Sequence, residues 1–173
     1  MMITDALICL LVTPVFLLIA LVILQNLLCI VTVESNSMTP TLSEGDRLLV
    51  LRYWPRTFLH RGQIVVVWPV PSQISFNSHP KPFGLIPFIK RIVGLPGDTL
   101  VTYLNEVSDF HRPRLQPLHD VSGKRIWTIP GKHIFVRGDN IVGGFDSLSW
   151  GPIPFESIVG VVVLKLRHQK HAK

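Results

Sequence analysis

Cysteine and charge are both scarce in this chain of 173 residues. Only Cys9 and Cys29 are present, and both lie in an apolar N-terminal stretch. If that stretch is one helix, a separation of 20 residues corresponds to about 30 Å of rise, too far for a disulfide within the chain. Two cysteines so placed exclude a disulfide scaffold and supply no zinc site.

Several motif classes are also missing. There is no internal repeat, and the 12 Gly and 14 Pro follow no period, which excludes collagen-like and low-complexity chains. Intrinsic disorder is excluded because apolar residues make up 47% of the chain. Phosphate-loop and paired-histidine metal motifs are absent, so we expect no cofactor and no metal.

Basic residues exceed acidic ones, which gives a net charge of +6. Such a balance suits an anionic membrane surface or a nucleic acid but selects neither, and a solvated basic surface is the ordinary explanation. The basic tail, residues 165–173, is most simply a solvated end or one that touches lipid headgroups. We expect membrane lipids as partners and no nucleic acid.

A long uncharged segment occupies the N-terminal end of the chain. No charged residue occurs between Ala6 and Val33, which predicts one transmembrane helix over about residues 6–32 and a membrane anchor over 1–33. A cleavable signal peptide fits less well, because Asp5 is the only preceding charge and the run is too long. The flanking Arg47 and Arg52 point weakly to an inside location for the C-terminal domain, but large domains translocate largely regardless of charge.

Residues 34–173 have the pattern of a mainly β domain. Short Val-, Ile- and Phe-rich runs are separated by Gly and Asp turns, and none has a helical period. The pattern predicts an antiparallel sheet or barrel-like domain. The expected strands are Arg47–Leu51, Gln63–Trp68, Phe88–Val93, Thr99–Leu104, Ile126–Ile129, His133–Arg137 and Ile158–Leu166. Residues 69–87 and 108–118 are expected to be surface loops.

Three segments could carry chemistry, although each alone has an ordinary explanation. Ser35 and Ser37 alternate before Thr39-Pro40, whose backbone is expected to be extended, yet a polar juxtamembrane linker would look the same. Lys90 shares a strand face with Phe88 and Ile92. Partial loss of hydration there would lower its pKa and make it a plausible base, although an edge-strand lysine is the commoner case.

The third segment is a turn followed by an acid and a hydroxyl. Asp139 and Asn140 follow Gly138 at the end of a strand, and Asp146 precedes Ser147. Asp and Asn occur in turns routinely, so turn formation alone would explain them.

In chain order, these segments resemble the type I signal peptidases, membrane-bound serine proteases with a Ser–Lys dyad. The resemblance rests on four stretches: Ser35-Asn36-Ser37-Met38-Thr39-Pro40-Thr41-Leu42, the strand Arg61–Val67, Lys90-Arg91-Ile92-Val93-Gly94-Leu95-Pro96-Gly97-Asp98, and Gly138-Asp139-Asn140 with Asp146-Ser147 and Gly151-Pro152-Ile153-Pro154. It covers most of residues 34–160.

The resemblance implies roles for individual residues. Ser37 would be the nucleophile and Lys90 the general base, while the Ser37 N–H and the Ser35 hydroxyl would form the oxyanion hole. Asp146, with Ser147, and the turn of Asp139 and Asn140 would support the site. It further implies that the enzyme removes signal peptides with small residues before the cut. Its catalytic domain would lie on the trans side of the plasma membrane or, alternatively, of an organelle's inner membrane.

Three positions depart from the family pattern. Leu148 stands where an Arg is common, Gly144 where a Ser that contacts the lysine is common, and Ile141 where an Arg often follows. These departures leave open a maturation protease dedicated to one substrate, such as a pilin-like protein or a secreted peptide. A catalytically inactive anchored domain that binds lipid or nucleic acid is a further alternative. A Ser-His-Asp triad is disfavoured, because none of the seven histidines has a triad context.

Overall fold

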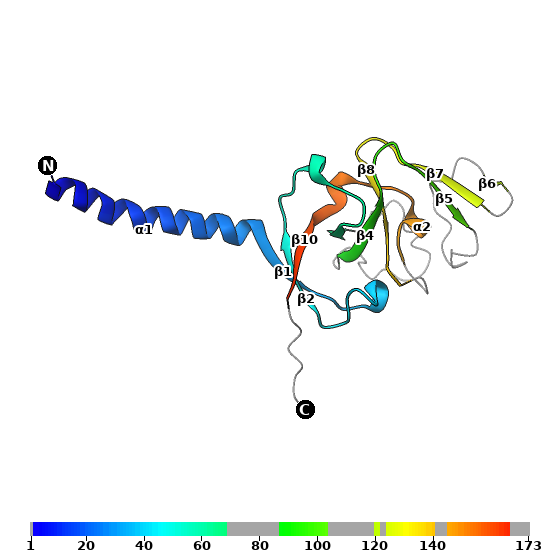
Figure 1. Cartoon of the computed structure of the whole chain (residues 1–173), viewed down its shortest axis with the longest axis horizontal. Helices are drawn as coiled ribbons and strands as arrows, with labels where there is room; N and C mark the ends of the chain where they lie inside the picture. Colours follow the sequence, from blue (N-terminus) through cyan, green and yellow to red (C-terminus); the bar gives the residue numbers. More distant parts are fainter. Residues whose placement is uncertain (1, 69–86, 104–119, 122–123, 141–144, 167–173) are drawn as a thin grey trace, which may run out of the picture.

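The computed structural model describes residues 2–68, 87–103, 120–121, 124–140 and 145–166. A single long helix, α1 (Met2–Leu27), projects from a β-rich body, and the C-terminal strand ends near the α1 side of that body (Figure 1). The side chains of α1 are described only from Val12 onward. Among the described residues, no helix is long and apolar enough to cross a membrane.

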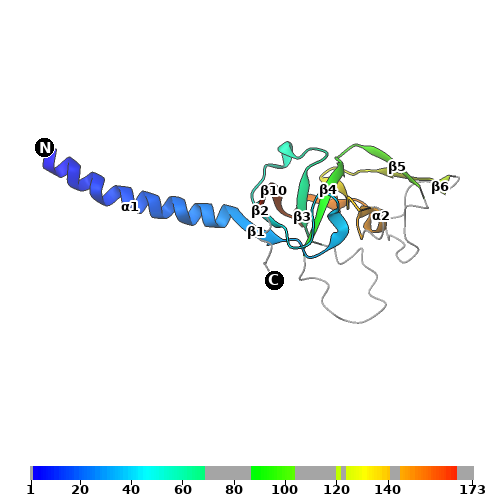
Figure 2. The same ribbon diagram turned by 60° about the horizontal axis from the view of Figure 1, so that its bottom comes forward.

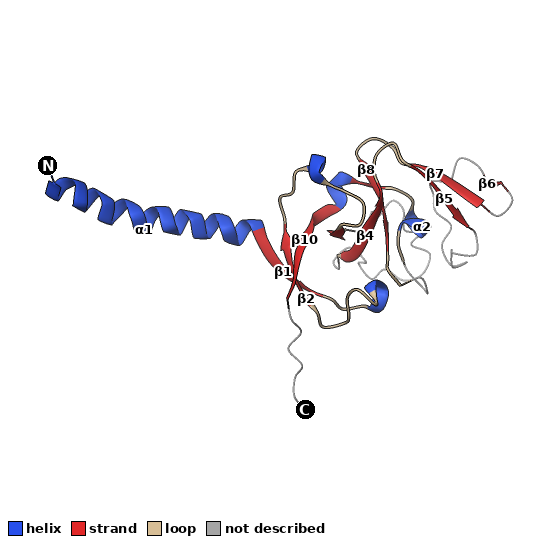
Figure 3. Cartoon of the chain, in the orientation of Figure 1, coloured by secondary structure: helices blue, strands red, loops and turns tan. Residues whose placement is uncertain are grey.

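Two antiparallel sheets build the body (Figure 3). The larger sheet has seven strands in the order β1-β2-β10-β3-β4-β8-β9. These strands are β1 (Leu28–Thr32), β2 (Arg47–Leu51), β10 (Ile158–Leu166), β3 (Ile64–Val67), β4 (Phe88–Gly94), β8 (His133–Arg137) and β9 (Ile153–Pro154).

The smaller sheet lies at the end of the molecule away from α1, as two views agree (Figures 1 and 2). Its order is β5-β7-β6, with bounds β5 (Thr99–Tyr103), β7 (Lys124–Thr128) and β6 (Asp120–Val121). Short helical turns complete the body: η1 (Asn36–Met38), η2 (Arg56–Phe58), α2 (Ser147–Trp150) and η6 (Phe155–Ser157).

The mainly β, antiparallel prediction is confirmed, and every predicted strand overlaps an observed one. The predicted end of the N-terminal helix is wrong. The helix stops at Leu27, and residues 28–32 form β1, which pairs with β2 from Leu28↔Leu51 to Thr32↔Arg47. The run Ile30-Val31-Thr32-Val33 is β-branched, which favours a strand once a partner edge is available. The two expected loops fall almost wholly outside the described residues.

One part of the core supports the turn that carries Ser37. Met38 of η1 is buried together with apolar side chains of β2 and β3 and of the chain on either side of η1: Val33, Leu42, Leu48, Val50 and Val66. A buried side chain inside a three-residue turn fixes the position of its neighbours. The core therefore holds η1 against the larger sheet, with Ser37 beside the buried Met38.

Candidate active site

Ser37 lies on η1, and the Ser35 side chain caps this short helix. The Ser37 N–H donates to Ser35 Oγ at 3.4 Å, and the Ser35 hydroxyl donates to Ser37 Oγ at 3.2 Å. Thr39, which follows, has extended backbone as predicted. Two hydroxyls and one N–H thus converge at the surface of this turn, where a carbonyl group could reach them.

Lys90 lies on β4 and is buried, with 1% of its surface exposed. Its Nζ lies 5.8 Å from the centre of the Phe88 ring, and Ile92 on the same strand face is fully buried. Burial lowers the pKa of Lys90, as expected from the strand pattern, while Asp146 and Asp139 raise it in opposition. The larger effect, desolvation, favours the neutral amine.

Gly138 is the place where Lys90 and Ser37 approach each other. A Cβ added to Gly138 would lie 2.6 Å from the Ser37 carbonyl oxygen and 3.6 Å from Lys90 Nζ. A contact below 3.0 Å with backbone is not tolerated by real Cβ atoms. The absence of a side chain at this position therefore lets η1 and β4 come together (β4 contacts η1).

The predicted turn residues Asp139 and Asn140 form hydrogen bonds to β4 and to η1, respectively. The Asn140 N–H donates to the Ser37 carbonyl at 3.1 Å, and Asn140 Nδ2 donates to the Asn36 carbonyl at 3.1 Å. Asp139 accepts two hydrogen bonds from Arg91, at 2.8 and 2.6 Å. These bonds lower the pKa of Asp139 and tie the turn to the strand that carries Lys90.

Asp146 and Ser147 connect α2 to the same turn and to β8. Asp146 caps α2 by accepting from the Leu148 N–H at 2.9 Å, and it also accepts from the Gly138 N–H at 3.0 Å. Ser147 Oγ accepts from the Val136 N–H at 3.0 Å. Burial of the Asp146 carboxyl raises its pKa. Hydrogen bonds thus connect η1 and Asp146 to the turn at residues 138–140, and Lys90 Nζ lies beside Gly138.

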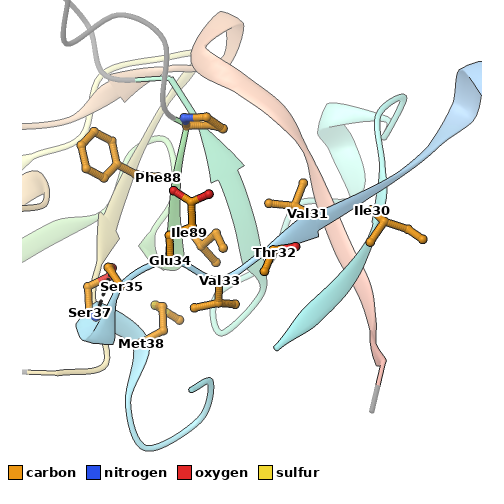
Figure 4. Close-up of a pocket in the computed structure, with 11 residues that line it drawn as sticks. Ile30, Val31, Thr32, Val33, Glu34, Ser35, Ser37, Met38, Phe88 and Ile89 are labelled. Atoms are coloured by element: carbon orange, nitrogen blue, oxygen red, sulfur yellow. Dashed lines mark hydrogen bonds between the residues drawn. The ribbon is translucent and has the colours of Figure 1, made fainter. Parts of the chain in front are cut away.

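A groove of about 380 Å³ leads to Ser37 (Figure 4). One wall is β1 and the chain that follows it, and the other is the start of β4 with the residue before it. Its lining residues are Ile30, Val31, Thr32, Val33, Glu34, Ser35, Ser37, Met38, Pro87, Phe88 and Ile89. Extended backbone thus contributes to both walls of the groove.

The departures from the family pattern have different outcomes. Leu148 is buried in a core cluster with Trp127, Ile129 and Phe135, so an apolar residue belongs there in this chain. Gly144 and Ile141 lie outside the described residues.

Of the histidines, His60 and His133 are described, and their Nδ1 atoms contact the carbonyls of Arg61 and Gly131.

Sequence reasoning misses some of the residues that build the site. Strand alternation places Arg91 on the face opposite Lys90, but it does not reveal the partner of Arg91, which is Asp139. The sequence assigns Gly138 only to a turn.

The part of the chain with described side chains contains no group of three His, Cys, Asp or Glu residues that could hold a metal ion, and Cys29 is a free thiol.

Comparison with known proteins agrees with the motif order. The family model described as signal peptidase, peptidase S26 matches residues 6–166. Similar proteins include a probable signal peptidase I-2 of Synechocystis sp., 33% identical over 74% of this chain and 58% of the relative. Signal peptidase I V of Bacillus subtilis is 32% identical over 75% of this chain and 80% of its own length.

A third relative comes from a eukaryotic organelle. The mitochondrial inner membrane protease subunit 1 of Schizosaccharomyces pombe is 31% identical over 78% of this chain and 71% of its own length. The chain thus spans little more than half of the Synechocystis protein but most of the other two. With a family model that matches nearly the whole chain, this protein belongs to the signal peptidase, peptidase S26 family.

Proposed function

We propose that this protein is a membrane-bound serine endopeptidase of the signal peptidase I type, which cuts signal peptides from precursor proteins. The observation that carries the proposal is a buried lysine with a lowered pKa, Lys90, next to the turn that presents Ser37. A lysine is a base only when it is neutral, and a buried position is where a neutral lysine is favoured.

In the proposed mechanism, Lys90 Nζ takes the proton of the Ser37 hydroxyl while Ser37 Oγ attacks the carbonyl carbon of the scissile bond. The protonated Lys90 then gives this proton to the nitrogen of the leaving amine, and an ester between Ser37 and the signal peptide remains. Lys90 next removes a proton from a water molecule, which attacks the ester, and it returns this proton to Ser37 Oγ as the ester bond breaks and the signal peptide leaves. Both stages use the same nitrogen as base and then as acid, so no second base is needed.

The negative oxygen formed in these steps needs donors about 3 Å away. We assign this role to the Ser37 N–H and the Ser35 hydroxyl, because the Ser37 nitrogen lies 3.4 Å from Ser35 Oγ. Without substrate the Ser35 hydroxyl donates to Ser37 Oγ. A change of the Ser35 side-chain rotamer would release the Ser37 N–H from Ser35 Oγ, and both donors could then bind the substrate oxygen.

The remaining predicted residues would act by holding these groups in place. Asn140 fixes the Ser37 backbone, and Asp139 fixes the turn against Arg91. Asp146 fixes Gly138. A displacement of about 1 Å can lower the rate of catalysis strongly. We therefore expect the loss of any of these contacts to reduce the cleavage rate more than it reduces the stability of the fold.

We further propose that α1 is a single-pass membrane anchor and that the β body lies on the trans side, where precursors emerge. The uncharged run of residues 6–33 and the relative named as an inner membrane protease support the membrane anchor. The groove begins at β1, directly after α1. A substrate held in the same membrane would therefore reach Ser37 at a high effective concentration.

The experiment that tests the function is direct. The purified protein in detergent is incubated with a panel of precursor proteins, and the new N-termini are sequenced. We expect cuts after short segments with small residues at the first and third positions before the cut, and no cuts by Ser37→Ala. A panel in which one precursor alone is cut would favour the dedicated maturation protease. Cleavage that Ser37→Ala retains would contradict the proposal.

The orientation has its own test. Protease added to the trans side of intact spheroplasts or organelles should digest the β body, because the proposal exposes it there. Protection until the membrane is lysed would show the opposite orientation. A protein of known cytoplasmic or matrix location serves as the control for membrane integrity.

A further inference from the structure

Glu34 stands out on the wall of the substrate groove. The groove is lined by apolar side chains and three hydroxyl residues, and Glu34 is the one ionisable side chain among its described lining residues. Figure 4 shows its carboxylate directed from the chain that follows β1 toward the side of Phe88 and Ile89. A lone charge on an apolar wall is a feature that the proposed chemistry does not use.

Glu34 lies between β1 and η1, and its side chain is accessible to solvent. Val33 is buried in the core beside Met38, whereas Glu34, the next residue, is exposed where it lines the groove. Glu34 is exposed, and the hydrogen bonds and ion pairs found in the described part of the chain do not include its carboxylate. Its charge is therefore available to a peptide in the groove.

The position of Glu34 along the groove indicates which part of a peptide it would meet. An extended peptide advances about 3.3 Å per residue. The wall runs from Ile30, near α1, to Ser37, and Glu34 lies directly before Ser35 at the Ser37 end. A peptide that enters from the α1 side and is cut at Ser37 thus places its last few residues before the cut beside Glu34.

We propose that Glu34 is a specificity-determining residue that favours a lysine or arginine, and disfavours aspartate or glutamate, shortly before the cut. This inference rests on the proposed function. Side chains alternate along an extended peptide, so the small residues at the first and third positions leave the second and fourth positions on the other face. The selected residue occupies one of these two positions.

The expected size of the effect is modest. Glu34 is exposed to water, where one ion pair changes binding only a few-fold and salt screens it. We expect a peptide with Lys at the selected position to be cleaved about fivefold better than the same peptide with Glu at low salt. The ratio should approach one in about 1 M salt.

The test uses matched peptides with Lys, Gln or Glu at the second or at the fourth position. kcat/KM is measured for the full-length protein in detergent and for Glu34→Gln, Glu34→Lys and Glu44→Gln. Glu44 is also exposed, lies on the same segment of the chain and does not line the groove, so it is the matched control. Binding is measured in parallel in a Ser37→Ala background, where the peptide stays intact.

The inference predicts that Glu34→Gln removes the Lys-over-Glu preference, Glu34→Lys reverses it and Glu44→Gln keeps it. An unchanged preference in Glu34→Gln, an equal loss in Glu44→Gln, or no preference in the original protein would each overturn it. The Kd ratios decide the question even if no peptide is cut. Failure of cleavage with a normal Kd preference would instead count against the proposed function.

Discussion

At the residue scale, the central question is how the pKa of a lysine is lowered beside two aspartates. Asp139 and Asp146 both raise the Lys90 pKa, yet burial of Lys90 outweighs them. Asp139 is paired with Arg91, whose guanidinium compensates its charge, and Asp146 accepts from two backbone N–H groups. The carboxylates are thus satisfied without a proton on Lys90, and they remain available to stabilise the lysinium once it forms.

The first prediction concerns the two reacting side chains. Ser37→Ala and Lys90→Ala should each reduce cleavage to near background, and the double variant should be little worse, because nucleophile and base act as one unit. Lys90→Arg should be inactive as well, since a guanidinium does not deprotonate in a protein. The measurement is kcat/KM on a precursor peptide, with circular dichroism to confirm folding. Substantial activity in a folded single variant would contradict the mechanism.

The second prediction concerns Asp146 and pH. Cleavage should rise with pH as Lys90 loses its proton, with a midpoint below the ordinary lysine pKa of about 10.5. Asp146 raises the Lys90 pKa, so Asp146→Asn removes a charge that holds the proton and should move that midpoint to lower pH. The maximal rate should fall at the same time, because one amide oxygen replaces two carboxylate oxygens at Gly138 and Leu148.

The measurement is kcat/KM against pH, with thermal melts at each pH. Asp98→Asn is the control, because Asp98 pairs with Arg61 and is not among the charges that act on Lys90. A midpoint that stays fixed or moves to higher pH in Asp146→Asn would contradict the assigned electrostatics.

The residues of the site are predictable from the sequence to different degrees. Ser35 and Ser37 are predicted from their sequence motif, and Lys90 is predicted from its motif and from strand alternation. The Arg91–Asp139 pair does not, because it joins positions 48 residues apart, and neither strand pattern nor turn composition specifies such a partner. Gly138 is recognisable as a turn residue, but its close approach to Ser37 depends on how β4 and β8 pair.

At the element scale, hydrophobic runs locate strands well but set one boundary wrongly. The strands predicted over Arg47–Leu51, His133–Arg137 and Ile158–Leu166 have the observed bounds. The residues of β1 fall within the predicted helix, because an apolar run has no internal sign of where helix gives way to strand. The strand exists because β2 offers it an edge, which is a tertiary effect.

The third prediction belongs to α2 and its packing. Leu148→Arg, which introduces the residue common in the family, should destabilise the protein by about 3 kcal/mol or more, because it buries a charge among Trp127, Ile129 and Phe135. Leu148→Met should cost less than about 1.5 kcal/mol. Urea unfolding followed by fluorescence measures both. A stable and more active Leu148→Arg variant would show that the position belongs to the site and not to the core.

At the scale of the whole molecule, the position of β1 determines where α1 can be separated from the body. Val33 is buried in the core below η1, and Cys29 and Val31 pack against the same cluster. The residues of β1 also form one wall of the groove. Residues 28–32 therefore belong to the larger sheet, although the sequence pattern predicts that they are part of the anchor.

The last prediction follows from this boundary. A chain that starts at residue 28, after an added Met, should fold and cleave a short soluble peptide, because it keeps every strand of the larger sheet. A chain that starts at residue 34 lacks β1, leaves the edge of β2 unpaired and removes Val33 from the core, so it should be unfolded or inactive. Thermal melts and kcat/KM on the peptide compare the two, with Ser37→Ala in the longer chain as the background for cleavage. Equal stability and activity of the two chains would mean that β1 is dispensable for folding and for cleavage.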